Sequence, residues 1–248
     1  MTSTQLFPLV SSLIILVFAT LVLRRFAVRR SGHLLVWGIG LLMFGVAALA
    51  EAYSTVAWHP VAFRLWYLAG AALSAAWIGQ GSVHLLAGTW GRSARRWNPP
   101  RLAAVLTGVL IAASLLAAYL VFSLPLNPAG FDAAAPLSAQ YREILPANAG
   151  VRKLTPFLNI YGTVALVGGA LYSAWLWSRK ETMFHRVVGN VLIAAGAMLI
   201  ASTSAMVRLG LADYLYLGQV LAAGLMFSGF LLASARASIP SPAAPAEA

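Results

Sequence analysis

The chain has 248 residues, of which 60% are hydrophobic and only 9% are charged, and its formal net charge is +11. An average soluble domain has about 25% charged residues, so this composition excludes a water-soluble globular protein. The chain contains no cysteine, which excludes disulfides, thiolate metal sites and cysteine nucleophiles. The class that remains is an integral membrane protein.

Seven apolar stretches are long enough to be transmembrane helices, because a spanning helix needs about 20 predominantly apolar residues. In chain order they lie near residues 5–23, 34–53, 61–88, 102–123, 156–178, 187–208 and 213–235. We therefore predict an all-α polytopic membrane protein in which one seven-helix domain covers residues 1–238. The Pro/Ala-rich end, residues 239–248, is low in complexity and is predicted to be a disordered tail.

The basic residues indicate how the chain crosses the membrane. Arg24 and Arg25 follow the first span instead of preceding it, which is not the pattern of a cleavable signal sequence. Most of the other basic residues lie in the loops that follow the odd-numbered spans, so the positive-inside rule places the N-terminus outside and the C-terminus inside. We expect a multi-pass protein of the bacterial cytoplasmic membrane. Its basic charge then reflects topology and contact with anionic lipid headgroups, and not nucleic-acid binding.

The loop between the fourth and fifth spans, residues 124–155, is unusually long. It is predicted to be external, and it carries four prolines, Pro125, Pro128, Pro136 and Pro146. Loops of this length are more often functional or disordered than purely connective. The favoured interpretation is a loose proline-rich connector, and the alternative is a small cap over an external cavity.

The first and last groups of spans show weak internal similarity. Laying residues 64–81 on residues 213–230 aligns Tyr67 with Tyr216. This alignment predicts three helices, one linker helix and three more helices in the same orientation, a 3+1+3 parallel repeat. Such repeats occur among transporters, which bind their substrates at the repeat interface.

Small residues four apart let membrane helices approach closely. They occur as Gly70 with Ser74, Ala75 with Gly79, Gly169 with Ser173, and Gly224 with Ser228. Spans three, five and seven are therefore expected to be central.

Ionisable residues lie near the ends of the spans. Glu51 and Arg64 are close in sequence at the outer ends of spans two and three, and Arg208 and Asp213 are placed similarly between spans six and seven. Each pair is expected to form a salt bridge at the rim. Alternatively, the charges line an outward-facing pocket in which Arg64 and Arg208 bind an anionic group. No acidic residue lies at the centre of a span, which argues against a proton-driven pump.

The third span carries a stripe of larger polar side chains on one helical face, formed by Trp77, Gln80, Gly81 and His84. His84 is expected at the same bilayer level as His33 and His185, and three histidines can ligate haem or a metal. Because none has a carboxylate partner at ligand spacing, we expect interface histidines and no metal or cofactor.

Known seven-helix families offer two resemblances. The stretch from Trp37 through Glu51 to Arg64, Trp66 and Tyr67 resembles the seven-helix input modules of bacterial sensor kinases, which implies a sensing module that acts through a separate partner. The 3+1+3 order looks like the SWEET sugar transporters, but no Pro-Gln pair marks a helix break. Pro8 and Pro156 are expected only to open their spans. Both lysines lie outside the spans, which excludes retinal chemistry.

Two functions follow from these observations. The favoured one is a non-enzymatic module that binds or senses a small ligand, or an accessory subunit of a membrane complex, with a membrane-protein partner or a second copy as its possible partner. The alternative is a facilitative transporter of a small neutral or amphipathic solute. An enzyme is not expected, because no nucleophile, acid pair or metal motif stands at catalytic spacing. The candidate ligand-binding residues are Glu51, Arg64, Tyr67, Gln80, Asn159, Arg208, Tyr216 and Gln219.

Overall fold

The computed structural model describes residues 3–90, 98–178, 184–208 and 215–234, and the side chains of all of these except residues 3–5 and 203–208. Within these ranges every regular element is a helix, and seven helices are long and apolar enough to cross a membrane. The prediction of an all-α protein with seven helices that are long and apolar enough to span a membrane is confirmed. The tail at residues 239–248 lies outside the described residues.

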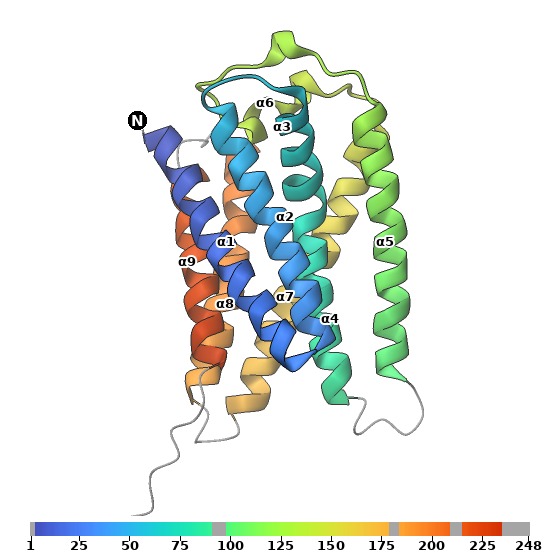
Figure 1. Ribbon diagram of the computed structural model, residues 1–248, viewed down its shortest axis with the longest axis vertical. Coiled ribbons are helices and arrows are strands. Elements are labelled where there is room, and N and C mark those ends of the chain that lie inside the picture. The colour runs from blue at the N-terminus through green and yellow to red at the C-terminus, as the bar shows by residue number, and fades with distance from the viewer. Residues whose placement is uncertain (1–2, 91–97, 179–183, 209–214, 235–248) are drawn as a thin grey trace, which may run out of the picture.

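The seven spans are numbered as in Figure 1, where the third consists of three consecutive helical segments. They are α1 (Ser3–Arg29), α2 (Gly32–Ser54), α3 (Pro60–Leu65) with η1 (Trp66–Ser74) and α4 (Ala75–Trp90), α5 (Pro99–Ser123), α7 (Gly150–Ser178), α8 (Phe184–Arg208) and α9 (Leu215–Ser234). The loop before α7 adds two short helices, η2 (Pro128–Gly130) and α6 (Leu137–Ile144).

Prolines occupy two kinds of position in these helices. Pro60 and Pro99 stand in the first turns of α3 and α5, each directly after a residue whose side chain accepts a backbone hydrogen bond, which is a favourable helix start. Pro8 and Pro156, in contrast, lie inside α1 and α7. The expectation that they open their spans is wrong, because both helices begin in more polar sequence that hydropathy does not count as membrane-spanning.

Six of the seven spans form a closed ring. Each contacts the next in the order α1, α2, α4, α7, α8 and α9, and α9 returns to α1. The fourth span, α5, stands outside the ring against α4, η1 and α7, at the edge of the bundle in Figure 1. Only 17% of the residues in the most apolar 18-residue stretch of α5 are buried, whereas 56% are buried in that of the third span. Spans one to three therefore form one half of the ring and spans five to seven the other.

Close backbone contacts hold neighbouring ring helices together. A Cβ atom on Gly162 of α7 would lie 2.2 Å from the carbonyl carbon of Ala75, and one on Gly79 would lie 2.5 Å from the Gly162 carbonyl oxygen. Spans three and five therefore meet at the predicted Ala75 and Gly79 pair, because only small residues allow this approach.

Helix α9 uses a different glycine from the one expected. A Cβ atom on Gly229 would lie 2.5 Å from the carbonyl oxygen of Gly189 in α8, whereas one on Gly224 would meet nothing within 4 Å. The prediction that Gly224 and Ser228 pack against another helix is wrong. Gly229 is five positions after Gly224, a rotation of roughly 140° around the helix axis. The two glycines therefore lie on different faces of α9.

An apolar cluster fills the ring at the end opposite α6. All six ring helices contribute to it, through residues that include Phe18, Leu41, Ile78, Leu166, Ala197 and Met226. A second cluster lies at the α6 end, where aromatic residues of span three meet the loop between α5 and α7. The space between these two clusters contains the site described below.

The loop before α7 is a folded cap. The side-chain amide of Gln140 donates to the carbonyl oxygens of Asp132 (2.8 Å) and Ala135 (2.7 Å) and accepts from the Asp132 backbone N–H. Leu137 and Ile144 of α6 are at most 1% exposed, and α6 reaches across to contact α8. Figure 1 shows α6 over one end of the bundle. The favoured interpretation of this loop as a loose connector is wrong, and the alternative, a small cap, describes it correctly.

Candidate functional site

A cavity of about 560 Å³ lies inside the ring beneath α6. Its walls come from α2, the third span, α7, α8 and α9, with α6 above, while neither α1 nor α5 contributes. This volume is within the range of small-molecule sites, about 300 to 1,000 Å³. The polar lining residues are Glu51, Tyr67, Ser74, Ser138, Tyr141, Arg142, Arg152, Thr155, Asn159, Thr163 and Gln219.

Glu51 is the acidic residue in this lining. Its side chain is 3% exposed, although its position near the end of α2 suggested a rim charge. Gln219 donates a long hydrogen bond of 3.4 Å to Glu51 Oε2. The indole of Trp66 lies beside the carboxylate, yet Oε1 has no partner with hydrogen-bond geometry among the described residues. The carboxylate is therefore buried at the cavity with one oxygen unsatisfied.

Arg64 does not form the expected salt bridge with Glu51. Its Nε donates to the carbonyl oxygen of Val121 at 3.3 Å, and its Nη2 donates to that of Leu124 at 3.0 Å. The last carbonyls of a helix have no partner within the helix, so Arg64 caps the end of α5. Arg64 does not line the cavity. The other predicted pair, formed by the Arg208 side chain and Asp213, lies outside the described residues.

Positive charge at the cavity comes instead from Arg142 of α6 and Arg152 of α7, which both line it. Their guanidinium carbons lie 5.9 Å and 5.7 Å from the centroid of the Tyr141 ring. Arg152 Nη1 also donates to the carbonyl oxygens of Leu145 (3.4 Å) and Pro146 (3.3 Å). Sequence reasoning missed both arginines as binding residues, because they belong to a loop that was expected to be loose.

Three aromatic rings connect the two arginines to Glu51 along one wall. Tyr141 contacts Tyr67 with 5.9 Å between ring centroids, and Tyr67 contacts Trp66 at 6.1 Å. Trp66 then lies beside Glu51. The Tyr67 hydroxyl hydrogen-bonds Thr155 Oγ1 at 3.3 Å, which ties this wall to α7. The cavity thus has a cationic region at Arg142 and Arg152 and a buried carboxyl group at Glu51, connected by an aromatic surface.

The third span is a π-helix, η1, along the part that faces the cavity. Such segments are rare and often occur at functional sites. Asn159 of α7 donates to the carbonyl oxygen of Ala71 in η1 at 2.8 Å. Ser74 donates to the Gly70 carbonyl oxygen at 2.8 Å. These two side chains hold backbone carbonyls of η1 at the cavity wall.

The polar stripe on the third span mostly faces α5. Trp77 Nε1 donates to Ser114 Oγ at 3.1 Å, and His84 Nε2 lies 2.8 Å from Thr107 Oγ1. Gln80, which is 0% exposed, donates to Thr107 Oγ1 and to the carbonyl oxygen of Ala103. The fourth residue of the stripe, Gly81, packs instead against a tryptophan of α2. This face attaches the fourth span to the ring and is not part of the cavity.

The structure brings together half of the residues predicted to bind ligand. Those that line the cavity are Glu51, Tyr67, Asn159 and Gln219. Tyr216 is buried but does not line it. Arg64 and Gln80 contact α5 instead, and the side chain of Arg208 is outside the described part of the chain.

The three histidines do not assemble a metal site. The start of α2 lies close to His84 of α4, because a Cβ atom on Gly32 would be 4.0 Å from His84 Nδ1. His33 packs edge-on against Trp37, and the buried Nε2 of His185 has no hydrogen-bond partner among the described residues. In these residues no group of three histidine or acidic side chains is placed to hold a metal ion.

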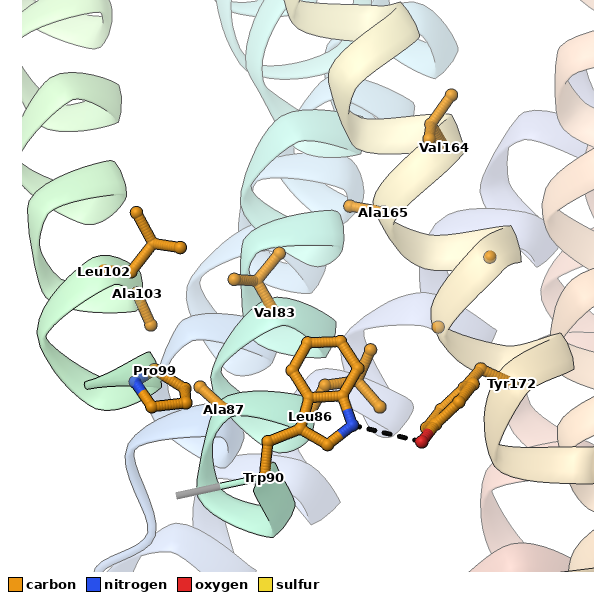
Figure 2. A pocket seen from close by; sticks show the side chains of 12 residues that line it. Val83, Leu86, Ala87, Trp90, Pro99, Leu102, Ala103, Val164, Ala165 and Tyr172 are labelled. Atoms are coloured by element: carbon orange, nitrogen blue, oxygen red, sulfur yellow. Dashed lines mark hydrogen bonds between the residues drawn. The ribbon is translucent and has the colours of Figure 1, made fainter. Parts of the chain in front are cut away.

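A second hollow of about 310 Å³ lies between α4, α5 and α7, at the end opposite α6 (Figure 2). Its lining is apolar except for Trp90 and Tyr172, whose indole N–H and hydroxyl are joined by a 3.1 Å hydrogen bond. Sites for specific small molecules usually combine an apolar lining with a few convergent polar groups. This crevice lacks them, and the central cavity is the better candidate.

Comparison with protein-family models, curated proteins and solved structures finds no match for this chain. The resemblances to sensor-kinase input modules and to SWEET transporters therefore stay predictions from the sequence. The described residues contain seven helices that are long and apolar enough to cross a membrane. Six of them form a ring, and five of these six line a polar cavity under a folded cap.

Proposed function

We propose that this protein is a non-enzymatic membrane module that binds a small ligand in its central cavity, as a sensor or as an accessory subunit of a membrane complex. The observation that carries the proposal is Glu51, a buried carboxylate with an unsatisfied oxygen at a cavity of about 560 Å³. A buried polar group without a hydrogen-bond partner costs free energy, and a charged one costs several kcal/mol. Ionisable residues retained at membrane depth are therefore candidate functional residues.

The closure of the ring at one end favours binding over permeation. Phe18, Leu41 and Phe230 belong to the apolar cluster that fills the ring away from α6. A solute in the cavity would have to displace this cluster to leave at that end. The ligand would therefore enter and leave on the α6 side, which the distribution of arginines predicts to be external.

Cysteine labelling tests this proposal directly, because the chain contains no cysteine. Ala48 lines the cavity, whereas Ala76 is buried between helices and does not line it. With a membrane-impermeant thiol reagent, Ala48→Cys should be labelled in intact cells but not from the opposite face in inside-out vesicles. Ala76→Cys, the matched control, should stay unlabelled from both faces. Absence of labelling of Ala48→Cys from the α6 side would contradict the proposal.

A facilitative transporter of a small neutral or amphipathic solute is the second candidate. It is supported by the ring itself, because two successive groups of three spans enclose the cavity and the fourth span stands outside. Transporters built from repeats bind their substrates where the repeats meet. Labelling of Ala48→Cys from both faces, together with solute flux in proteoliposomes, would favour this candidate over a one-sided binding module.

A further inference from the structure

We infer that the cavity binds an elongated zwitterion, with a primary ammonium group at Glu51 and a carboxylate at Arg142 and Arg152. This inference rests on the proposed function and adds the chemical class of the ligand. It depends on three features of the cavity, namely the carboxyl group with an unpaired oxygen, the two arginines at the α6 end, and the aromatic wall that connects them.

The first feature is the hydrogen-bonding state of Glu51. The Gln219 amide and the Trp66 indole are the donors beside this carboxyl group, and its Oε1 has no partner with hydrogen-bond geometry among the described residues. The hydrogen bond from Gln219 to Oε2 is long, at 3.4 Å, and no cationic side chain in the described ranges pairs with the carboxylate. A ligand ammonium would supply both the missing N–H donors and the compensating charge. A quaternary ammonium would supply charge but no donor, so a primary amine fits better.

The second feature is the pair of arginines at the α6 end of the cavity, Arg142 in α6 itself and Arg152 in the first turn of α7. Within the described residues, Arg142 donates through Nε to the Tyr141 hydroxyl and Arg152 donates through Nη1 to two loop carbonyls. Each guanidinium has five N–H donors, so most of them remain for a ligand. Ser138 Oγ, buried in the same lining, has no partner among the described residues. Two neighbouring cations and a hydroxyl favour a carboxylate, which arginine binds through paired hydrogen bonds.

The third feature is the separation of the two ends. Tyr141, Tyr67 and Trp66 contact one another in succession, with ring centroids 5.9 Å and 6.1 Å apart, and connect the arginines at one end to Glu51 at the other. An α-amino acid carries both charges next to one carbon atom and does not match this separation. A ligand with its charges at opposite ends of a chain matches it, and the rings give the chain an apolar surface. Both ω-amino acids and short peptides have this chemistry.

Isomers provide a sharp test with the 248-residue protein in detergent. 6-Aminohexanoate and norleucine have the same atoms, but only the first carries its charges at opposite ends. We expect calorimetry to show 6-aminohexanoate binding at least about tenfold more tightly than norleucine, hexanoate or hexylamine, because each of these loses one charge-assisted contact. Trialanine and N-acetyl-trialanine form a second pair, and tighter binding of free trialanine than of 6-aminohexanoate would identify short peptides as the source.

Variants assign each charge to its end of the ligand. Glu51→Gln should abolish the preference for 6-aminohexanoate over hexanoate, and Glu51→Asp should keep part of it. Arg142→Gln should abolish the preference over hexylamine, and this exposed residue can be replaced without disturbing the core. Lys153→Gln is the matched control, because it removes the same charge from an exposed position outside the cavity lining.

The outcomes separate this inference from the proposed function. If norleucine binds as tightly as its isomer, or if Glu51→Gln keeps the preference for the amine, the zwitterion is refuted while ligand binding stands. If none of the probes binds but Ala48→Cys is labelled from the α6 side, the ligand class is wrong and the accessible cavity remains. If neither binding nor labelling occurs, both proposals are refuted.

Discussion

Replacing Gln80 should weaken the attachment of the fourth span to the ring. Gln80 is fully buried and donates to Thr107 Oγ1 and the Ala103 carbonyl oxygen, both at 2.8 Å, and it accepts a hydrogen bond from the Tyr161 hydroxyl. Hydrogen bonds between membrane helices contribute about 0.6 kcal/mol each on average, so Gln80→Leu should cost about 2 kcal/mol for three bonds. The Tyr161 hydroxyl loses its acceptor, which adds about 1 kcal/mol or more.

Reversible unfolding in mixed micelles would measure this free energy. A double-mutant cycle with Tyr161→Phe provides the internal control, because the two side chains share one hydrogen bond. The double variant should be less destabilised than the sum of the single variants, by about 0.6 kcal/mol and at most about 1.7 kcal/mol. A loss below about 0.6 kcal/mol for Gln80→Leu would refute the assignment of this stripe to the α5 contact. Strict additivity with Tyr161→Phe would refute the hydrogen bond between Gln80 and Tyr161 of α7.

Two further predictions concern helix packing and the cap of α5. Gly162→Leu should lower the thermal midpoint strongly, because even its Cβ atom would lie 2.2 Å from the Ala75 carbonyl carbon and overpacking typically costs about 1–3 kcal/mol. Gly224→Leu is the control, because a Cβ atom there meets nothing within 4 Å. Its free energy of unfolding should stay within about 0.5 kcal/mol of that of the parent protein. Equal effects in a thermal-unfolding assay would contradict this packing. Arg64→Gln should destabilise the protein by about 1–3 kcal/mol, because its hydrogen bonds to two carbonyls are lost. Its affinity for 6-aminohexanoate, measured by calorimetry, should stay unchanged. Reduced affinity without destabilisation would instead indicate that Arg64 binds the ligand.

The seven spans could be predicted because hydrocarbon-length apolar runs leave few alternatives. Their ends could not be placed as well. Helix α7 begins at Gly150, six residues before the apolar run that starts near Pro156. Its first turns contain Arg152 and Lys153, which hydropathy counts as loop although backbone hydrogen bonding continues through them.

The stripe on the third span illustrates what periodicity can and cannot predict. The spacing of Trp77, Gln80 and His84 correctly placed them on one face, because helical geometry is local. The partner of that face depends on which helix packs there, and hydropathy does not distinguish a linker helix from a cavity. The hydrogen bonds to α5 supply this missing information.

Most of the polar lining of the cavity could not be predicted, for a related reason. Glu51 is three residues from the end of α2, a position that predicts a rim charge, but its side chain is only 3% exposed. Arg142 and Arg152 reach the cavity only because the loop folds around the side-chain hydrogen bonds of Gln140. Such contacts between distant residues have no periodic signal in a sequence.

The position of α5 outside the ring has a consequence for how such a chain can be built. Three crossings leave a chain on the opposite side of the membrane from where it began, so a second group of three joined directly to the first would run upside down. One additional crossing restores the parity. Because α5 contributes nothing to the cavity lining, its role can be purely topological. It carries the chain back across the membrane, so that the first helix of each half of the ring starts on the same side of the bilayer.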